Sequence, residues 1–168
     1  MTAIFLRPLG RQERDLQGLI DRIAGEYQTV SFPPHLTICG VPDEPAVFDA
    51  AAAYIKECRL LPLTVAKTAV TGAVITPFRA VFIEVENTSA LREFRERLRE
   101  IVGAPALIPP HISLLYTLDR VTQAPRPDLD AAALARIAAG CADAISDTDF
   151  TLAQPVVNSA GRDVNAWR

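Results

Sequence analysis

Cysteine is scarce in this sequence, and its scarcity excludes several classes of protein. The chain holds three cysteines, Cys39, Cys58 and Cys141, and they form no CxxC pair. An odd number of cysteines at such wide spacings disfavours a disulfide framework or a structural zinc site. Free thiols suit a reducing compartment, so we expect a cytoplasmic protein.

Long apolar runs and surplus positive charge are absent too. No apolar segment approaches the roughly 20 residues that cross a membrane, so we expect no membrane partner. The start of the chain, MTAIFLRPLG, lacks the pattern of a signal peptide. The net charge of −3 does not indicate an extended surface for nucleic acid. Neither a Walker A loop nor a GxGxxG motif occurs, which disfavours a nucleoside triphosphatase or a dinucleotide-dependent enzyme.

What the sequence does contain is enough apolar material for one domain over residues 1–168. Apolar residues make up 49% of the chain, which argues against disorder. A chain of this length hides about 70% of its unfolded surface when it folds. The proline-containing segment 119–128 is too short to separate two domains.

Strands and helices are expected to alternate along the chain. The pattern predicts an α+β protein with two roughly matching halves, each with one histidine-bearing strand and two helices. We expect two lobes that face each other, with the histidine strands where they meet. The predicted strands cover about 3–7, 35–39, 61–72, 78–86, 111–116 and 150–157, and the predicted helices about 11–27, 44–60, 89–102 and 128–142.

The helix expected over 89–102 is rich in charge of both signs. Ser89 is its expected N-cap. Its arginines, Arg95 among them, are interleaved with glutamates. This pattern predicts a solvated face with i,i+4 ion pairs such as Glu93–Arg97, because a basic RNA-binding stripe would lack the acids.

The chain has only two histidines, and both stand in the same setting. The segments SFPPHLTICG and IPPHISLLYT each place two prolines before the histidine and a hydroxyl residue two positions after it. The prolines lack a backbone donor and restrict the chain, so they mark where each strand begins. A single histidine in an apolar strand is more often a packed core residue, but this repetition is hard to ascribe to packing.

The repeated pattern suits the chemistry of a phosphate. Residues i and i+2 of a strand share a face, so His35 lies beside Thr37 and His111 beside Ser113. Hydroxyls donate hydrogen bonds to phosphate oxygens. Imidazoles, with an ordinary pKa of about 6.5, can take a proton from water or give one to a leaving alkoxide. A zinc site is the alternative, but no third ligand has suitable spacing and the hydroxyls would go unused.

These motifs resemble those of the 2H phosphoesterase superfamily, which is named for two His-x-Ser/Thr motifs. The segment 110–116, PHISLLY, is similar to the second motif of the plant and yeast cyclic phosphodiesterase branch. The segments 71–86 and 159–168 also resemble that branch. The resemblance implies a bilobal fold of two antiparallel sheets, with helices outside and a central groove. It also implies metal-independent opening of nucleoside 2′,3′-cyclic phosphates or ADP-ribose 1″,2″-cyclic phosphate, with no cofactor.

The resemblance assigns roles to residues of this chain. His35 and His111 become the acid–base pair, with His111 activating water and His35 protonating the leaving oxygen; symmetry also allows the reverse. The substrate-binding residues that we predict, partly from the resemblance, are Thr37, Ser113, Tyr116, Phe5 and Phe78.

Three of these assignments need comment. Phe5 stands where the branch tends to carry tryptophan, which predicts weaker stacking or a different substrate. Tyr116 points away from the site in a regular strand, and reaches it only if the strand ends or bulges near Leu115. Phe78 lies just before an apolar strand, where it can stack on a base or serve as an ordinary core aromatic residue.

Two other functions stay open at this point. One is an enzyme of the same superfamily that processes RNA 2′,3′-ends or joins RNA as a 2′-5′ ligase does. Its partner would be an RNA end, whereas the modest acidity of this chain favours a small nucleotide. The other is a non-catalytic phosphate-binding module, which does not need two titrating groups. We expect a monomer in each case.

Overall fold

The computed structural model describes residues 2–42, 44–58, 62–105 and 108–158. Over these residues the chain forms four helices and six strands. In chain order they are β1 (Thr2–Pro8), α1 (Arg11–Tyr27), β2 (Leu36–Val41), α2 (Pro45–Glu57), β3 (Leu63–Thr76), β4 (Arg79–Val85), α3 (Ser89–Val102), β5 (His111–Leu115), α4 (Ala131–Ala144) and β6 (Asp149–Asn158). The predicted α+β class is confirmed, and each predicted element lies close to its expected place.

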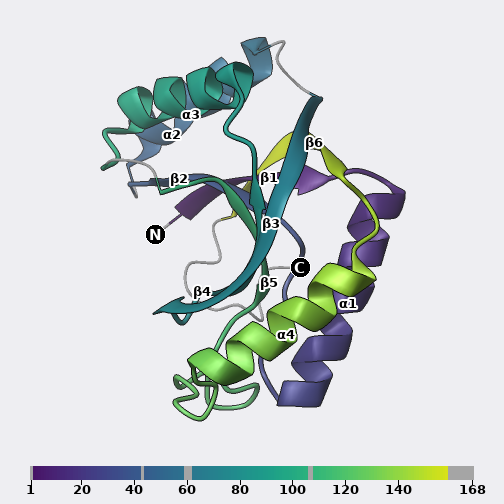
Figure 1. Ribbon diagram of the computed structural model, residues 1–168. Coiled ribbons are helices and arrows are strands. Elements are labelled where there is room, and N and C mark those ends of the chain that lie inside the picture. The colour runs from purple at the N-terminus through teal and green to yellow at the C-terminus, as the bar shows by residue number, and fades with distance from the viewer. Residues whose placement is uncertain (1, 43, 59–61, 106–107, 159–168) are drawn as a thin grey trace.

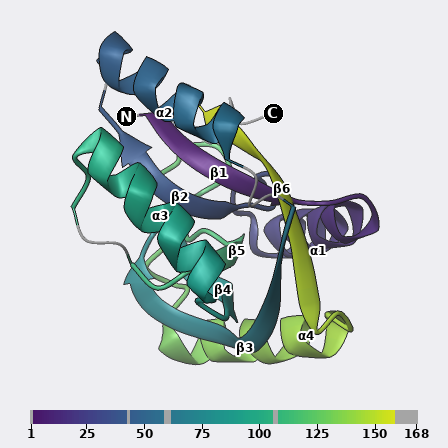
Figure 2. The same ribbon diagram turned by 90° about the horizontal axis from the view of Figure 1, so that it is seen from above.

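The six strands form one closed antiparallel sheet in the order β1-β2-β5-β4-β3-β6. The family resemblance implied two antiparallel sheets, and on this point the structure differs. The difference has a simple cause: β1 pairs with both β2 and β6, and the 14-residue β3 pairs with both β4 and β6. Because β6 pairs with both β1 and β3, the two halves of the chain form a single sheet (Figure 2).

The two histidine strands meet at a narrow junction. In the ladder between β2 and β5 a single pair of residues, Leu36 and Ile112, is in register. Their side chains are fully buried in the hydrophobic core. The expected meeting of the two histidine strands is therefore present, although within one sheet.

The helices cover the sheet from two sides. In Figure 1, α2 and α3 lie together on one side, and α1 and α4 lie on the other. Helix α1 buries the apolar residues that recur at helical spacing, Leu16, Leu19, Ile20 and Ile23. Over the described ranges, no helix combines the length and apolarity that crossing a membrane requires.

Helix α3 differs from its prediction in two details. Thr88, one residue before the expected cap, accepts the hydrogen bond from the Leu91 amide. Arg95 is not on the solvated face: it is 3% exposed, and its Nη2 donates to the Ile108 carbonyl at 2.6 Å. This hydrogen bond holds Ile108, which comes three residues before His111, against α3.

The ion pairs on the exposed face of α3 also differ from the prediction. They join Arg97 to Glu100 at 3.2 Å and Arg99 to Glu96 at 2.6 Å. Both are i,i+3 pairs, whereas the sequence predicted the i,i+4 pair Glu93–Arg97. Either spacing places two side chains on neighbouring turns of a helix, so the sequence alone does not select between them.

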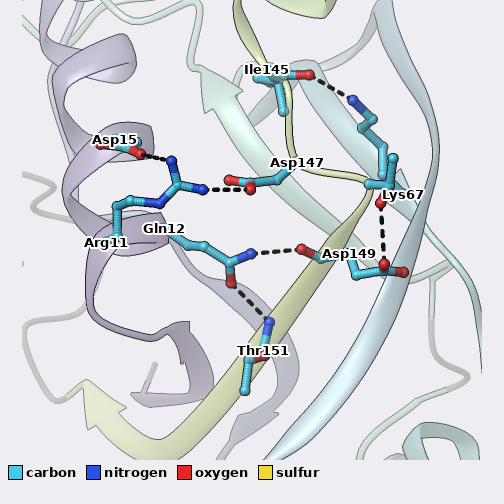
Figure 3. Close-up of polar contacts among 9 residues, drawn as sticks. Arg11, Gln12, Asp15, Lys67, Ile145, Asp147, Asp149 and Thr151 are labelled. Atoms are coloured by element: carbon cyan, nitrogen blue, oxygen red, sulfur yellow. Dashed lines mark hydrogen bonds and ion pairs between the residues drawn. The ribbon is translucent and has the colours of Figure 1, made fainter.

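A polar cluster fastens the start of α1 to β6 (Figure 3). The Gln12 side chain donates to the Asp149 carbonyl at 2.6 Å and accepts from the Thr151 amide at 3.0 Å. Arg11 pairs with Asp147 at 2.9 Å just before the strand. These contacts hold β6 in the position from which it pairs with both β1 and β3.

Gly72 of β3 lies where the backbone of α4 comes closest to the sheet. A Cβ atom at this position would lie 2.1 Å from the carbonyl oxygen of Leu134. We expect Gly72→Ala to destabilise the fold by about 1–3 kcal/mol, because main-chain atoms must move apart. Urea unfolding would measure the change. Gly140→Ala is a matched control, since nothing lies within 4 Å of its added atom; equal stability of the two variants would contradict the prediction.

Candidate active site

The pairing of β2 with β5 brings the two motifs side by side in the sheet. Because Leu36 pairs with Ile112 in an antiparallel ladder, continuing the register places His35 opposite Ser113 and Thr37 opposite His111. These four residues alternate with the buried pair, so they share the other face of the sheet. The two histidines are then diagonal neighbours, which in an antiparallel pair lie about 7–8 Å apart, with their Cβ atoms somewhat closer.

Both imidazoles are oriented by the same main-chain contact. Nδ1 of His35 lies 2.7 Å from the Pro33 carbonyl oxygen, and Nδ1 of His111 lies 3.0 Å from that of Pro109. A carbonyl oxygen only accepts, so each Nδ1 donates its hydrogen. In the neutral ring this leaves the lone pair on Nε2, the atom that can take up a proton.

His35 is the more enclosed of the two histidines. Its side chain is 4% exposed, and its ring lies 4.1 Å from that of Phe5 between centroids. The Tyr116 hydroxyl lies 3.4 Å from its Nε2. Burial lowers the pKa of His35 to about 4, and the charges of His111 and Arg7 act in the same direction, against the hydrogen bond to Pro33. His35 is therefore neutral near pH 7.

His111 has a more polar environment. It is 7% exposed, and the Phe82 ring meets its imidazole edge-on with centroids 5.4 Å apart. Burial lowers the pKa of His111, and the positive charges of Arg79 and Arg95 lower it further. Two contacts act the other way: the hydrogen bond to the Pro109 carbonyl, and the carboxylate of Glu84, which is its partner in the β4–β5 ladder.

The two hydroxyl residues of the motifs are placed differently. Ser113 is buried, and its Oγ donates to the Phe78 carbonyl at 3.3 Å. Thr37 is half-buried and lies opposite Phe5 in the β1–β2 ladder. The long contact from Ser113 is weak, so this hydroxyl can turn toward another acceptor.

Tyr116 reaches the site in the way that its strand parity requires. Strand β5 ends at Leu115, and the β4–β5 register shifts where Leu115 and Ser113 face consecutive residues of β4. The Tyr116 ring stacks on Phe32 at 3.7 Å and meets Phe78 edge-on at 5.5 Å. Burial raises the pKa of its hydroxyl, which stays protonated as a donor.

The predicted site residues thus gather around the two histidines, and their roles in binding remain predictions. Phe5 contacts His35, while Phe78 contacts Tyr116 through its ring and Ser113 through its carbonyl. Phe5 is buried yet lies outside the main hydrophobic cluster. It belongs to the face that carries the histidines.

Three residues of β4 at this site were missed by the sequence analysis: Arg79, Phe82 and Glu84. Phe82 and Glu84 pair with Ser113 and His111, and Arg79 stacks over the Phe82 ring. Glu84 also accepts a hydrogen bond from Thr71 Oγ1 at 2.7 Å. A carboxylate inside the apolar run FIEV was the available signal, since an acid in a buried strand needs a polar neighbour.

The comparisons with known proteins leave the family open. No family model matches the sequence, and no curated protein matches it significantly. The segment 159–168, which carries part of the resemblance, lies outside the described residues. Among the residues that the structure does describe, no three histidine, cysteine or acidic side chains are grouped so that they could hold a metal ion.

Proposed function

We propose that the protein is a 2H phosphoesterase-like enzyme that hydrolyses a cyclic phosphodiester in a small nucleotide without a metal ion. The substrate is a nucleoside 2′,3′-cyclic phosphate or ADP-ribose 1″,2″-cyclic phosphate. One observation carries the proposal: two histidines with the same Nδ1 orientation share one face of the sheet with two hydroxyl residues. Two proton-transfer groups beside hydroxyl donors are what opening such a ring requires.

The proposed reaction is an in-line attack by water on phosphorus. One imidazole takes a proton from the water as the new P–O bond forms. The other gives a proton to the ribose oxygen as the old P–O bond breaks. The products are a phosphate monoester and a free hydroxyl, and the two rings exchange protonation states. Thr37 and Ser113 donate hydrogen bonds to the non-bridging oxygens.

The environments of the two rings favour the reverse of the assignment made from sequence. His35 has the strongly lowered pKa, of about 4, so it begins the reaction neutral and suits the base. Burial, Arg79 and Arg95 lower the pKa of His111 as well, but the hydrogen bond to Pro109 and the Glu84 carboxylate oppose this lowering, so His111 is the ring better suited to carry the proton for the leaving oxygen. His35 can take a proton only when a water displaces the Tyr116 hydroxyl from Nε2, and the 3.4 Å contact is long enough to yield.

A non-catalytic phosphate-binding module is the second candidate. The enclosure of His35, at 4% exposed and with Tyr116 at its Nε2, favours it. One assay separates the two: purified protein in excess EDTA with the four nucleoside 2′,3′-cyclic phosphates, ADP-ribose 1″,2″-cyclic phosphate and a short cyclic-phosphate-ended RNA. We expect turnover of a small nucleotide. Binding without turnover would favour the module, turnover of the RNA alone would favour end processing, and rescue by a divalent ion would replace the mechanism.

The hydroxyl residues give a second test of the site. Thr37→Ala and Ser113→Ala should each lower kcat/KM by about ten- to a hundred-fold, because a hydrogen bond to an anion contributes about 1.5–3 kcal/mol. Steady-state kinetics on the best substrate would measure this. Ser89→Ala is the control, since Ser89 is exposed and Thr88 is the helix cap. Full activity of the Thr37→Ala, Ser113→Ala double variant would mean that these residues only form strands.

A further inference from the structure

Arg79 is a charged residue beside the second motif that the proposed mechanism leaves without a role. Its guanidinium carbon lies 4.5 Å from the centre of the Phe82 ring. That ring meets His111 edge-on, and Phe82 is also the ladder partner of Ser113. Arg79 is therefore separated by one aromatic ring from a histidine and a hydroxyl of the site.

Among the residues that the structure describes, none is an anionic partner for the charge of Arg79. Its Nε is buried and makes no hydrogen bond with any described residue. Within the described ranges no carboxylate lies at ion-pair distance from its guanidinium. Arg7, whose charge acts on His35, differs because it pairs with Glu13. Partial burial removes water from a guanidinium at a cost in free energy, and without an anionic partner that cost is only partly offset.

The site has a corresponding need for positive charge. A phosphodiester is an anion, and burial keeps His35 neutral near pH 7 while also lowering the pKa of His111. Hydroxyl donors carry no net charge. A cation at the edge of the site would supply positive charge that the two histidines, with their lowered pKa values, supply poorly in the free protein.

We propose that Arg79 binds the phosphate of the substrate, with its N–H groups directed at the non-bridging oxygens. A guanidinium presents several donors in one plane, which match two phosphate oxygens at once, and its stacking on Phe82 restricts the plane of that fork. The inference deepens the proposed function and rests on it for the identity of the substrate. The binding of a phosphate group beside Arg79 can be tested without turnover.

The test compares Arg79→Gln and Arg79→Lys with the control Arg97→Gln, which removes the same charge from the exposed face of α3. The first readout is the Kd of inorganic phosphate by calorimetry at neutral pH. We expect Arg79→Gln to weaken binding about ten- to a hundred-fold. The Kd of Arg79→Lys should lie between those of the wild type and Arg79→Gln, because lysine keeps the charge but lacks the planar set of donors. The Kd of the control should stay near that of the wild type. The value of kcat/KM on the best cyclic phosphate should follow the same order.

A second readout excludes a merely structural role. The charged groups that act on His111 are Arg79, Arg95 and Glu84. Removing the Arg79 charge while leaving the other two in place should raise the pKa of His111, as measured by NMR titration of its ring. Arg79→Lys should leave that pKa close to wild type, and it also decides the question if Arg79→Gln does not fold.

The outcomes separate this inference from the proposed function. Unchanged phosphate affinity in folded Arg79→Gln overturns the inference, even if the wild type hydrolyses a cyclic phosphate. Phosphate binding that depends on Arg79 supports it, even if no cyclic phosphate is turned over and the proposed function falls. Equal losses in Arg79→Gln and Arg97→Gln would indicate a general effect of net charge and would also overturn it.

Discussion

Replacing either histidine with alanine is expected to lower kcat by about 10²- to 10⁴-fold, the range that one proton-transfer group contributes. Under the proposed mechanism the cause is specific: the His35 variant lacks the group that takes the proton of the attacking water, and the His111 variant lacks the group that protonates the leaving oxygen. Single-turnover kinetics on the best cyclic phosphate would measure the chemical step. Circular dichroism must show that each variant is folded, because both rings are buried.

Under the proposed mechanism, the wild-type protein should also have a bell-shaped pH–rate profile. Its two limbs belong to the coupled histidine pair rather than to either ring. Each alanine variant should lose one limb, and exposed Val121→Ala should keep both. Activity that survives either substitution nearly intact would show that the rings are structural. The non-catalytic module would then be the better description.

The second large effect is on stability, and it does not depend on the proposed reaction. His35 has a pKa of about 4 in the folded protein and about 6.5 when unfolded. The unfolded state therefore binds more protons between these values. The contribution of neutral His35 to the free energy of unfolding is fully present above pH 6.5 and is lost as the pH falls toward 4. By linkage the loss is about 3 kcal/mol, and His111 acts in the same direction.

Urea unfolding at pH values from 4.5 to 7.5 would measure this dependence. The matched comparison is His35→Gln, which does not titrate but keeps a polar side chain. Its free energy of unfolding at pH 7 should be lower, and its slope between pH 6.5 and 4.5 should be clearly flatter than that of the wild type. Parallel curves would mean that His35 keeps an ordinary pKa and is open to water. The carboxylates cancel in this comparison because both proteins carry them.

The strands and helices were predictable because their patterns are local. Residues 11–27 and 89–102 show the helical spacing of apolar side chains, and α1 and α3 begin and end there. The cap of α3 was misplaced by one residue, since Thr88 and Ser89 are adjacent and both are good capping residues. Local chemistry does not choose between such neighbours.

Closure of the sheet and the burial of Arg95 were not predictable, because both depend on contacts between distant segments. Strand β3 extends to Thr76, where the side chains are exposed and carry no pattern. Arg95 stands among exposed arginines in the sequence, and only the approach of Ile108 distinguishes it. The same reason hid Glu84, which the register between β4 and β5 places opposite His111, and Arg79, which reaches the site by stacking on Phe82.

The placement of the candidate residues was more predictable, because strand parity and a repeated motif already join four of them; their roles stay predictions. The sequence also predicts that Tyr116 reaches the site only if its strand ends or bulges near Leu115. A regular strand would have pointed it away, and the end of β5 together with the shifted register brings its hydroxyl to His35. Strand parity thus predicts one specific irregularity near Leu115, and the structure has it.

Because both imidazoles are oriented by proline carbonyls, their orientation tolerates amino-acid substitution at the positions that orient them. Many catalytic histidines are oriented by a carboxylate, and mutation of that carboxylate leaves the ring in the wrong tautomer. In this protein the acceptors are main-chain oxygens of Pro33 and Pro109, which every residue type possesses. No single side-chain replacement removes them. Selection would instead act on backbone shape, which the second proline of each pair restricts by holding the residue before it extended.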